Sequence, residues 1–161
     1  MPATRLTPAR LLVTFSLVLG LAMSLFALSS TVSPTTPRAS AMISAAKEGQ
    51  ALSWARSRKG ARYQYGATGP HRFDCSGLTR WVYAHVGKSL PHSSAAQARR
   101  VVHITRRHAR PGDLVFFSGY GGVYHVAIWA GHGYIWHAPY SGARVRREHL
   151  WTGHVFFGRV R

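Results

Sequence analysis

Apolar positions recur with helical spacing in the middle of the chain. Residues 43–59 are rich in alanine and stop at Gly60, which predicts a helix. A second helix is predicted to begin near Cys75, because apolar and aromatic residues follow at helical spacing: Leu78, Trp81, Val82 and His85. A loop is expected over residues 66–70 between the two helices. Residues 93–100 are expected to form a short helix capped by serine.

After Pro111, short runs of aromatic and β-branched residues replace the helical spacing. Gly and Ser turns separate these runs at the spacing of an antiparallel meander. The predicted strands cover residues 113–118, 124–130, 134–138, 143–146 and 154–160. Helices first and strands later indicate an α+β fold, with N-terminal helices packed on a C-terminal antiparallel β-sheet.

The first 41 residues follow a different pattern. Arg5 and Arg10 precede an uncharged stretch over residues 11–28, and a Ser/Thr/Pro segment follows up to Ala41. A basic start, an apolar middle and small residues before a cut are typical of a secretory signal peptide. An uncleaved membrane anchor is the alternative, because the apolar stretch reaches the lower limit of a bilayer span. We therefore expect a secreted or cell-wall-associated protein in which residues 42–161 form one domain.

Basic residues far outnumber acidic ones, with 21 Lys and Arg against 4 Asp and Glu, and the formal net charge is +17. Such a surface favours polyanions, which include nucleic acid, an anionic membrane and an anionic wall polymer. Because export separates the protein from nucleic acid, we expect no nucleic-acid partner and consider a wall polymer the better candidate. So few acids also exclude a carboxylate-rich calcium site.

Cys75 is the only cysteine, so an internal disulfide is excluded. The segment FDCSG (residues 73–77) comes directly before the second predicted helix, which places Cys75 in the first turn. Unpaired backbone N–H groups and the helix dipole stabilise a thiolate at this position, and the thiolate is the nucleophile of cysteine enzymes. A small, buried structural cysteine is the alternative.

A cysteine nucleophile needs a base, and spacing selects two of the ten histidines. His125 and His137 are equally distant from Gly131, so a turn centred there places them directly opposite each other on one face. His125 would then meet the thiol and His137 would orient it, as in a Cys-His-His triad. A two-residue turn would put them on opposite faces. Zinc is the rival, but no HExxH, CxxC or HxH spacing occurs, so no metal site is expected.

Six short motifs follow one another between residues 51 and 160. They are GARYQYGATGP (60–70), FDCSGL (73–78), LPHSS (90–94), RPGDLVFF (110–117), HVAI (125–128) and HAP (137–139). In this order they resemble the NlpC-type family of secreted bacterial peptidoglycan endopeptidases, which are papain-like cysteine peptidases. The resemblance implies a papain-like fold and an enzyme without a cofactor.

The resemblance also implies roles for individual residues. Cys75 would be the nucleophile, His125 the general base and then acid, and His137 the residue that orients His125. Further substrate-binding positions are implied at Tyr63, Asp74, Ser76 and His92. Tyr63 matches a tyrosine of the family whose hydroxyl approaches the active site. Asp74 and Ser76 match positions that help to recognise a free amine in members that cut between γ-D-glutamate and a diamino acid of the stem peptide.

His92 stands where relatives usually carry Arg, so a permanently charged, planar guanidinium group is replaced by an imidazole. If His92 faces a carboxylate of the stem peptide, we expect binding to tighten in mildly acidic solution. The expected function is hydrolysis of a stem-peptide amide by a monomeric enzyme. An amidase that cuts between muramic acid and L-alanine is one alternative, and a cationic wall-polymer-binding protein on an inactive scaffold is another.

Overall fold

The computed structural model describes residues 44–161, and the expected signal segment over residues 1–41 lies outside this range. The described helices are α1 (Ala45–Ser57), α2 (Cys75–Ala84), α3 (Ser94–Ala98) and the 3-10 helix η1 (Arg106–His108). Within residues 44–161, no helix is both long enough and apolar enough to cross a bilayer.

A short polar side chain begins each α-helix by accepting a backbone N–H that the helix leaves unpaired. Ser44 accepts from Lys47 at the start of α1, and Asp74 accepts from Gly77 at the start of α2. Ser93 caps α3, which ends at Ala98 rather than at residue 100. The three helices predicted from the sequence are thus confirmed, with small differences at their ends.

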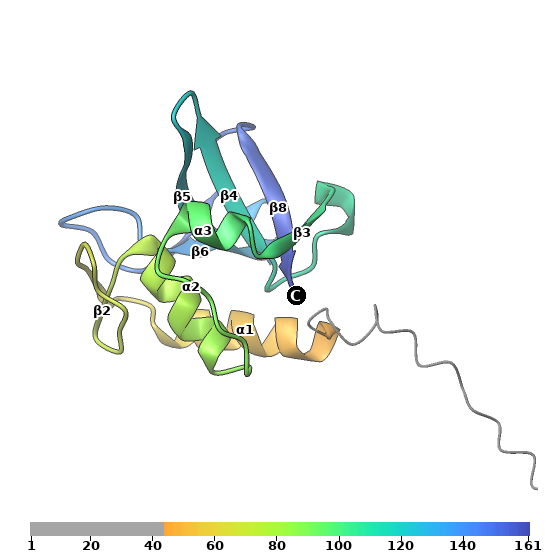
Figure 1. The fold of residues 1–161 in the computed structure, drawn as a ribbon. Coiled ribbons are helices and arrows are strands. Elements are labelled where there is room, and N and C mark those ends of the chain that lie inside the picture. The colour runs from red at the N-terminus through yellow and green to blue at the C-terminus, as the bar shows by residue number, and fades with distance from the viewer. Residues whose placement is uncertain (1–43) are drawn as a thin grey trace, which may run out of the picture. The chain divides into compact units, whose positions relative to one another are not determined.

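Six antiparallel strands form the main sheet, in the spatial order β3-β8-β4-β5-β6-β7 (Figure 1). Their bounds are β3 (Val101–Ile104), β4 (Leu114–Gly119), β5 (Gly122–Gly131), β6 (Tyr134–His137), β7 (Arg146–His149) and β8 (Val155–Val160). Two further strands, β1 (Arg62–Tyr63) and β2 (Arg72–Phe73), form a separate parallel pair.

The sheet differs from the predicted meander in three ways. The last strand, β8, returns to lie between β3 and β4, and β3 itself was not predicted. The strand predicted at residues 143–146 begins at Arg146 instead. Ala143 forms a backbone hydrogen bond with Tyr63, and Val145 forms backbone hydrogen bonds with Gly60 and Ala61. These bonds connect the segment around β1 to the residues just before β7.

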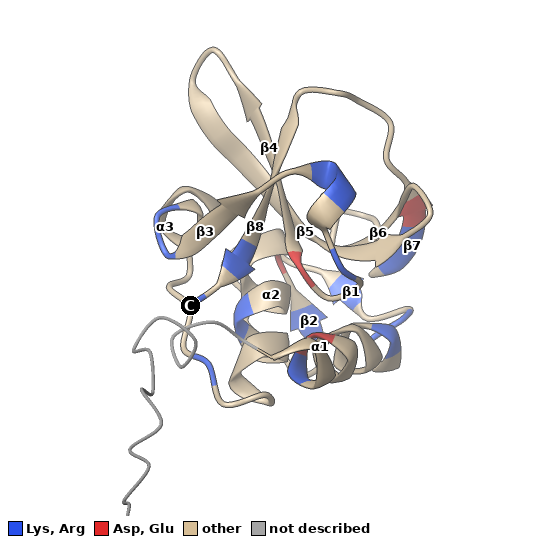
Figure 2. Cartoon of the chain, turned by 90° about the vertical axis from the view of Figure 1, so that its right-hand side faces the viewer, with Lys and Arg blue, Asp and Glu red and all other residues tan. Residues whose placement is uncertain are grey.

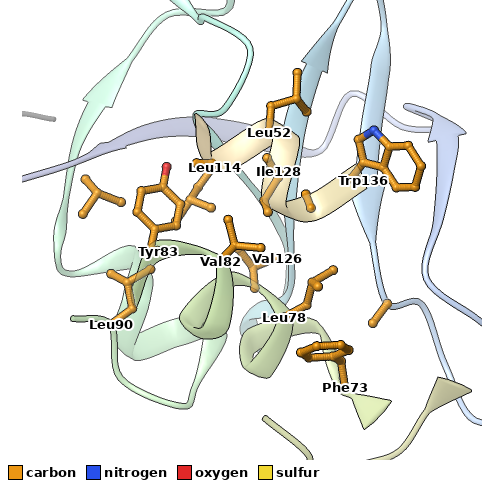
Figure 3. Close-up of a cluster of buried hydrophobic side chains, with 14 of the residues drawn as sticks. Leu52, Phe73, Leu78, Val82, Tyr83, Leu90, Leu114, Val126, Ile128 and Trp136 are labelled. Carbon is orange, nitrogen blue, oxygen red and sulfur yellow. The ribbon is translucent and has the colours of Figure 1, made fainter. Parts of the chain in front are cut away.

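Helices α1 and α2 pack on one face of the sheet and bury an apolar core (Figure 3). Leu52 of α1 and Leu78 and Val82 of α2 meet Leu114 and Ile128 of the sheet. Alternate residues of the strands point the other way into a second cluster: Val115, Phe117, Ala127, Trp129, Ile135, Leu150 and Phe157. The predicted α+β architecture is confirmed.

A buried ion pair network also joins the helices to the sheet. Arg159 of β8 lies 2.7 Å from Glu48 Oε1 through its Nε and 2.8 Å from Asp113 Oδ2 through its Nη2. The hydroxyl of Tyr83 in α2 donates to the carbonyl oxygen of Gly112 at 2.7 Å. Burial raises the pKa of Glu48, and the neighbouring Asp113 raises it further, while the two arginines nearby oppose the shift. These contacts hold α1 and α2 against the start of β4.

Candidate active site

Cys75 is the first residue of α2 and is half-buried. Burial raises the pKa of its thiol, and the negative charge of Asp74 adds to that effect. Backbone hydrogen bonds oppose the shift, the largest of them with Val126, the residue after His125. Burial and the neighbouring carboxylate thus favour the protonated thiol, in the opposite direction to the thiolate stabilisation expected at the start of a helix.

His125 of β5 and His137 of β6 are joined by a hydrogen bond of 3.0 Å between Nε2 of the first and Nδ1 of the second. Both imidazoles are buried, with 8% and 1% of their surface exposed. The bond uses Nε2 of His125 and leaves its Nδ1 for a third group. The predicted pair therefore shares one face of the hairpin.

The hairpin reaches this arrangement by a different route from the one expected. Gly131 pairs with Tyr134, so the turn has only two residues, and this alone would separate the histidines. However, the register shifts by one residue between Trp129 and Gly131, and this bulge restores the shared face. Ile128 pairs with Trp136, so the histidines are diagonal neighbours rather than directly opposed.

Burial also controls the charge of the two imidazoles. Burial, together with a smaller contribution from His137, lowers the pKa of His125 to about 3, while Glu148 acts in the opposite direction. Burial lowers the pKa of His137 as well, although its hydrogen bond to Glu148 raises it. Both rings are therefore neutral near pH 7, so His125 can accept a proton there.

All three predicted catalytic residues line one open cavity of about 500 Å³. The residues around it are Tyr63, Cys75, Tyr124, His125, His137, Pro139, Tyr140, Arg146, Glu148 and Trp151. The geometry thus brings a thiol and a pair of imidazoles to one solvent-accessible surface.

A second cavity of about 420 Å³ adjoins the first. It contains all four predicted substrate-binding residues, namely Tyr63, Asp74, Ser76 and His92. The two cavities share Tyr63, Cys75 and Tyr124, so the surface continues on both sides of the thiol. Nearness to Cys75 also contributes to a raised pKa of Tyr63, for which burial is the main cause.

Asp74 is almost fully engaged within the protein. Its Oδ1 accepts from the Gly77 backbone at 2.7 Å and from the Ser76 hydroxyl at 3.1 Å. Its Oδ2 accepts from the Gly66 backbone at 2.8 Å and lies 2.8 Å from Nε2 of His92. His92 thus bonds through Nε2 to a carboxylate of the protein itself.

Sequence reasoning missed the partner of His137. Nε2 of His137 lies 2.9 Å from Oε2 of Glu148 in β7. The same oxygen accepts a hydrogen bond from Nε of Arg146 at 2.8 Å and forms an ion pair with its Nη2 at 2.8 Å. The hydrogen bond from Arg146 lowers the pKa of Glu148. The available signal was the spacing of Arg146 and Glu148, which puts them on one side of a strand, but β7 was placed too early in the chain.

The arrangement is suited to acyl transfer. It offers a thiol, a neutral imidazole that lines the same cavity and backbone N–H groups at the start of α2, which can stabilise an oxyanion. Among residues 44–161, no group of three or more His, Cys, Asp or Glu side chains is placed to hold a metal ion.

Comparison with known proteins identifies the family. The family model described as NlpC/P60 matches residues 60–158, which include the thiol, both histidines and the second cavity. The chain belongs to the NlpC/P60 family. This NlpC/P60 domain is 45% identical over 107 residues to the "Probable endopeptidase Cgl2188" of Corynebacterium glutamicum, in a match that covers 66% of this chain and 50% of the relative.

Two other relatives extend the comparison. The "Bifunctional muramidase/DL-endopeptidase CwlT" of Bacillus subtilis is 36% identical over 110 residues, covering 64% of this chain and 33% of the relative. The crystal structure of the NlpC/p60 domain of peptidoglycan hydrolase SagA superposes with a TM-score of 0.64 at 33% identity, over 71% of this chain and 98% of that one. The chain thus spans half or less of the two curated relatives and nearly all of the solved domain.

Proposed function

We propose that this NlpC/P60 domain hydrolyses an amide bond in the stem peptides of bacterial peptidoglycan. The observation that carries the proposal is the hydrogen-bonded pair of His125 and His137, which lines one open cavity together with Cys75. The relatives named endopeptidase, DL-endopeptidase and peptidoglycan hydrolase support the same chemistry.

In the proposed mechanism, Nδ1 of His125 takes the proton of the Cys75 thiol as the sulfur attacks the amide carbonyl carbon. Backbone N–H groups at the start of α2 stabilise the negative oxygen of the tetrahedral intermediate. The imidazolium of His125 then protonates the leaving nitrogen, and the C–N bond breaks. Water, deprotonated by His125, attacks the resulting thioester, which releases a carboxylic acid and the thiol.

The bond between γ-D-glutamate and the diamino acid is our specific proposal. It rests on the resemblance at Asp74 and Ser76 and on the Bacillus subtilis relative, which is named a DL-endopeptidase. The second cavity, which contains both residues, lies directly beside Cys75 and offers a place for the part of the peptide before the cut. An amidase would instead leave free L-alanine ends and intact muramic acid.

The direct test is to incubate the protein with purified sacculi and to identify the released fragments by mass spectrometry. Cys75→Ala serves as the matched control, because it removes only the sulfur. We expect release by the wild type and none by the variant, with new γ-D-glutamate carboxyl ends. Equal release by both proteins would reject the cysteine mechanism. Free L-alanine ends would replace our bond by the amidase bond.

We further propose that the protein is exported, as residues 1–41 predict, since peptidoglycan lies outside the cell membrane. These residues lie outside the described range, so the proposal rests on the sequence pattern alone. A mature protein that begins at residue 42 in the culture medium or the wall fraction would support it. An intact chain retained in the membrane fraction would favour the anchor.

A further inference from the structure

We propose that Glu148, held in place by Arg146, is a positioning residue that sets the direction of the hydrogen-bond chain in the active site. The inference rests on the proposed function, because it concerns how the same triad is kept able to react. Three bonds carry it: Arg146 to Glu148, Glu148 to His137, and His137 to His125.

The carboxylate of Glu148 sets the direction of the hydrogen bonds. An ionised carboxylate can only accept hydrogen bonds. Arg146 donates from Nε to Oε2 of Glu148 at 2.8 Å, its Nη2 forms an ion pair with the same oxygen at 2.8 Å, and this contact keeps the carboxylate ionised at neutral pH. Nε2 of His137 lies 2.9 Å from the same oxygen. Nε2 must therefore carry a proton and donate it to Glu148.

The second bond follows from the first. His137 is buried and neutral, so a proton on its Nε2 leaves a lone pair on its Nδ1. Nε2 of His125, which lies 3.0 Å from that lone pair, must be the donor. His125 is neutral too, so its Nδ1 is unprotonated. That lone pair is the one that the thiol of Cys75 requires.

Without Glu148, nothing fixes the proton on His137. The reversed tautomer would donate from Nδ1 of His137 to Nε2 of His125 and would place the proton of His125 on Nδ1. A ring in that state cannot take the thiol proton, and a wrong tautomer of this kind disables a triad. The other titratable groups that line this cavity are Tyr63, Tyr124, Tyr140 and Arg146.

A purely structural role does not account for the arrangement. The side chains of Glu148 and Arg146 are 37% and 38% exposed at the edge of the sheet. Exposed ion pairs contribute little to folding stability. The chain also has only four acids, and this one is placed against the imidazole that orients the base.

The kinetic test compares three variants by steady-state cleavage of an isolated stem peptide. In Glu148→Ala we expect kcat to fall about 100-fold, the low end of a general base's contribution, with little change in KM. In Glu148→Gln we expect most activity to return, because the amide oxygen still accepts from Arg146 and His137. Arg147→Ala is the matched control on the same strand; Arg147 stacks over Tyr134 and should leave kcat unchanged.

Nitrogen NMR of histidine-labelled protein adds a readout that does not depend on catalysis. We expect protons on Nε2 of both His125 and His137 in the wild type, and an Nδ1 proton on His125 in part of the Glu148→Ala population. Unchanged tautomers, or an unchanged kcat in Glu148→Ala, would overturn the inference while the proposed function stands. A wild type that cleaves no stem peptide would overturn the proposed function. The histidine tautomers measured by NMR would still show whether Glu148 fixes the proton on His137.

Discussion

Cys75 and His125 are each removed from water by the packing around them, and this removal sets their protonation. It raises the pKa of the thiol and lowers the pKa of the imidazole to about 3. Both shifts favour the neutral forms at rest, so in the proposed mechanism the proton would move as the sulfur attacks rather than beforehand. The helix start can still serve the reaction by stabilising the oxyanion.

The pH dependence of cleavage tests this neutral pair. We expect kcat/KM to hold from neutral pH down to about pH 4, because a base stays unprotonated until the pH approaches its own pKa.

Alkylation by iodoacetamide reports on Cys75 alone, since no other cysteine exists. Its rate should rise only above the ordinary titration range of cysteine. Fast alkylation at mildly acidic pH would instead indicate a resting thiolate.

The contribution of His137 can be measured by truncation. His137→Ala removes the acceptor of the His125 Nε2–H bond, so the base loses its orientation. We expect kcat to fall by about 100-fold with a smaller change in KM. His132→Asn, in the turn of the same hairpin, is the control, because asparagine tolerates the positive φ of 52° found there. Equal activity of the two variants would remove His137 from the triad.

The position of a single residue could be predicted from the sequence when that residue belongs to one short motif. Cys75 was predicted at the first turn of a helix and is its first residue. Glu148 could not be found in this way, because its partner belongs to another strand and the contact depends on register. The pairing of His92 with Asp74 is also set by the fold, since the two residues are 18 positions apart.

At the scale of elements, Gly112 marks the place where α1 meets the start of β4. Its φ is +107°, and an added Cβ would lie 2.0 Å from the carbonyl oxygen of Glu48. Gly112→Ala must therefore push α1 from the sheet and disturb the pair of Glu48 and Arg159. We expect the free energy of unfolding in urea to fall by roughly 2–4 kcal/mol.

Gly121→Ala is the matched control for that substitution. An added Cβ at Gly121 has no heavy atom within 4 Å, so we expect a change below about 1 kcal/mol. Similar unfolding midpoints for the two variants would show that α1 yields easily at this contact, contrary to our expectation.

The elements themselves were predictable from periodicity, but their pairing was only partly so. The predicted helices begin behind their polar caps, and the strand runs appear close to their predicted positions. The bulge in β5 has no clear sequence signal, because it depends on how a two-residue turn is accommodated. The position of β8 is set by contacts with β3 and β4, which lie far from it in the sequence.

At the scale of the whole molecule, most of the acidic side chains are buried. Glu48, Asp74 and Asp113 are 1%, 6% and 0% exposed, so among the described residues only Glu148 offers a carboxylate to solvent. Lysine and arginine are spread over several elements instead (Figure 2). Most of the net positive charge of the sequence therefore belongs to residues 44–161, where few exposed carboxylates oppose it.

This charge distribution predicts electrostatic attachment to an anionic wall. We expect Cys75→Ala, which cannot digest the substrate, to sediment with sacculi at low salt and to be released as salt rises from about 0.05 to 0.5 M, because salt screens exposed charges. Sacculi stripped of anionic polymers are the control and should retain less protein. Retention that is independent of salt would contradict the electrostatic role.

The half-buried, protonated thiol has a consequence for chemical durability. Oxidants react with the thiolate, and an over-oxidised cysteine cannot be recovered. Because Cys75 is the only cysteine, no second thiol of the chain can trap its sulfenic acid as an internal disulfide. Under the proposed mechanism, the surroundings that favour the protonated thiol would thus also protect Cys75 from peroxide. Inactivation by peroxide should accordingly be slow at neutral pH and speed up as the solution becomes alkaline.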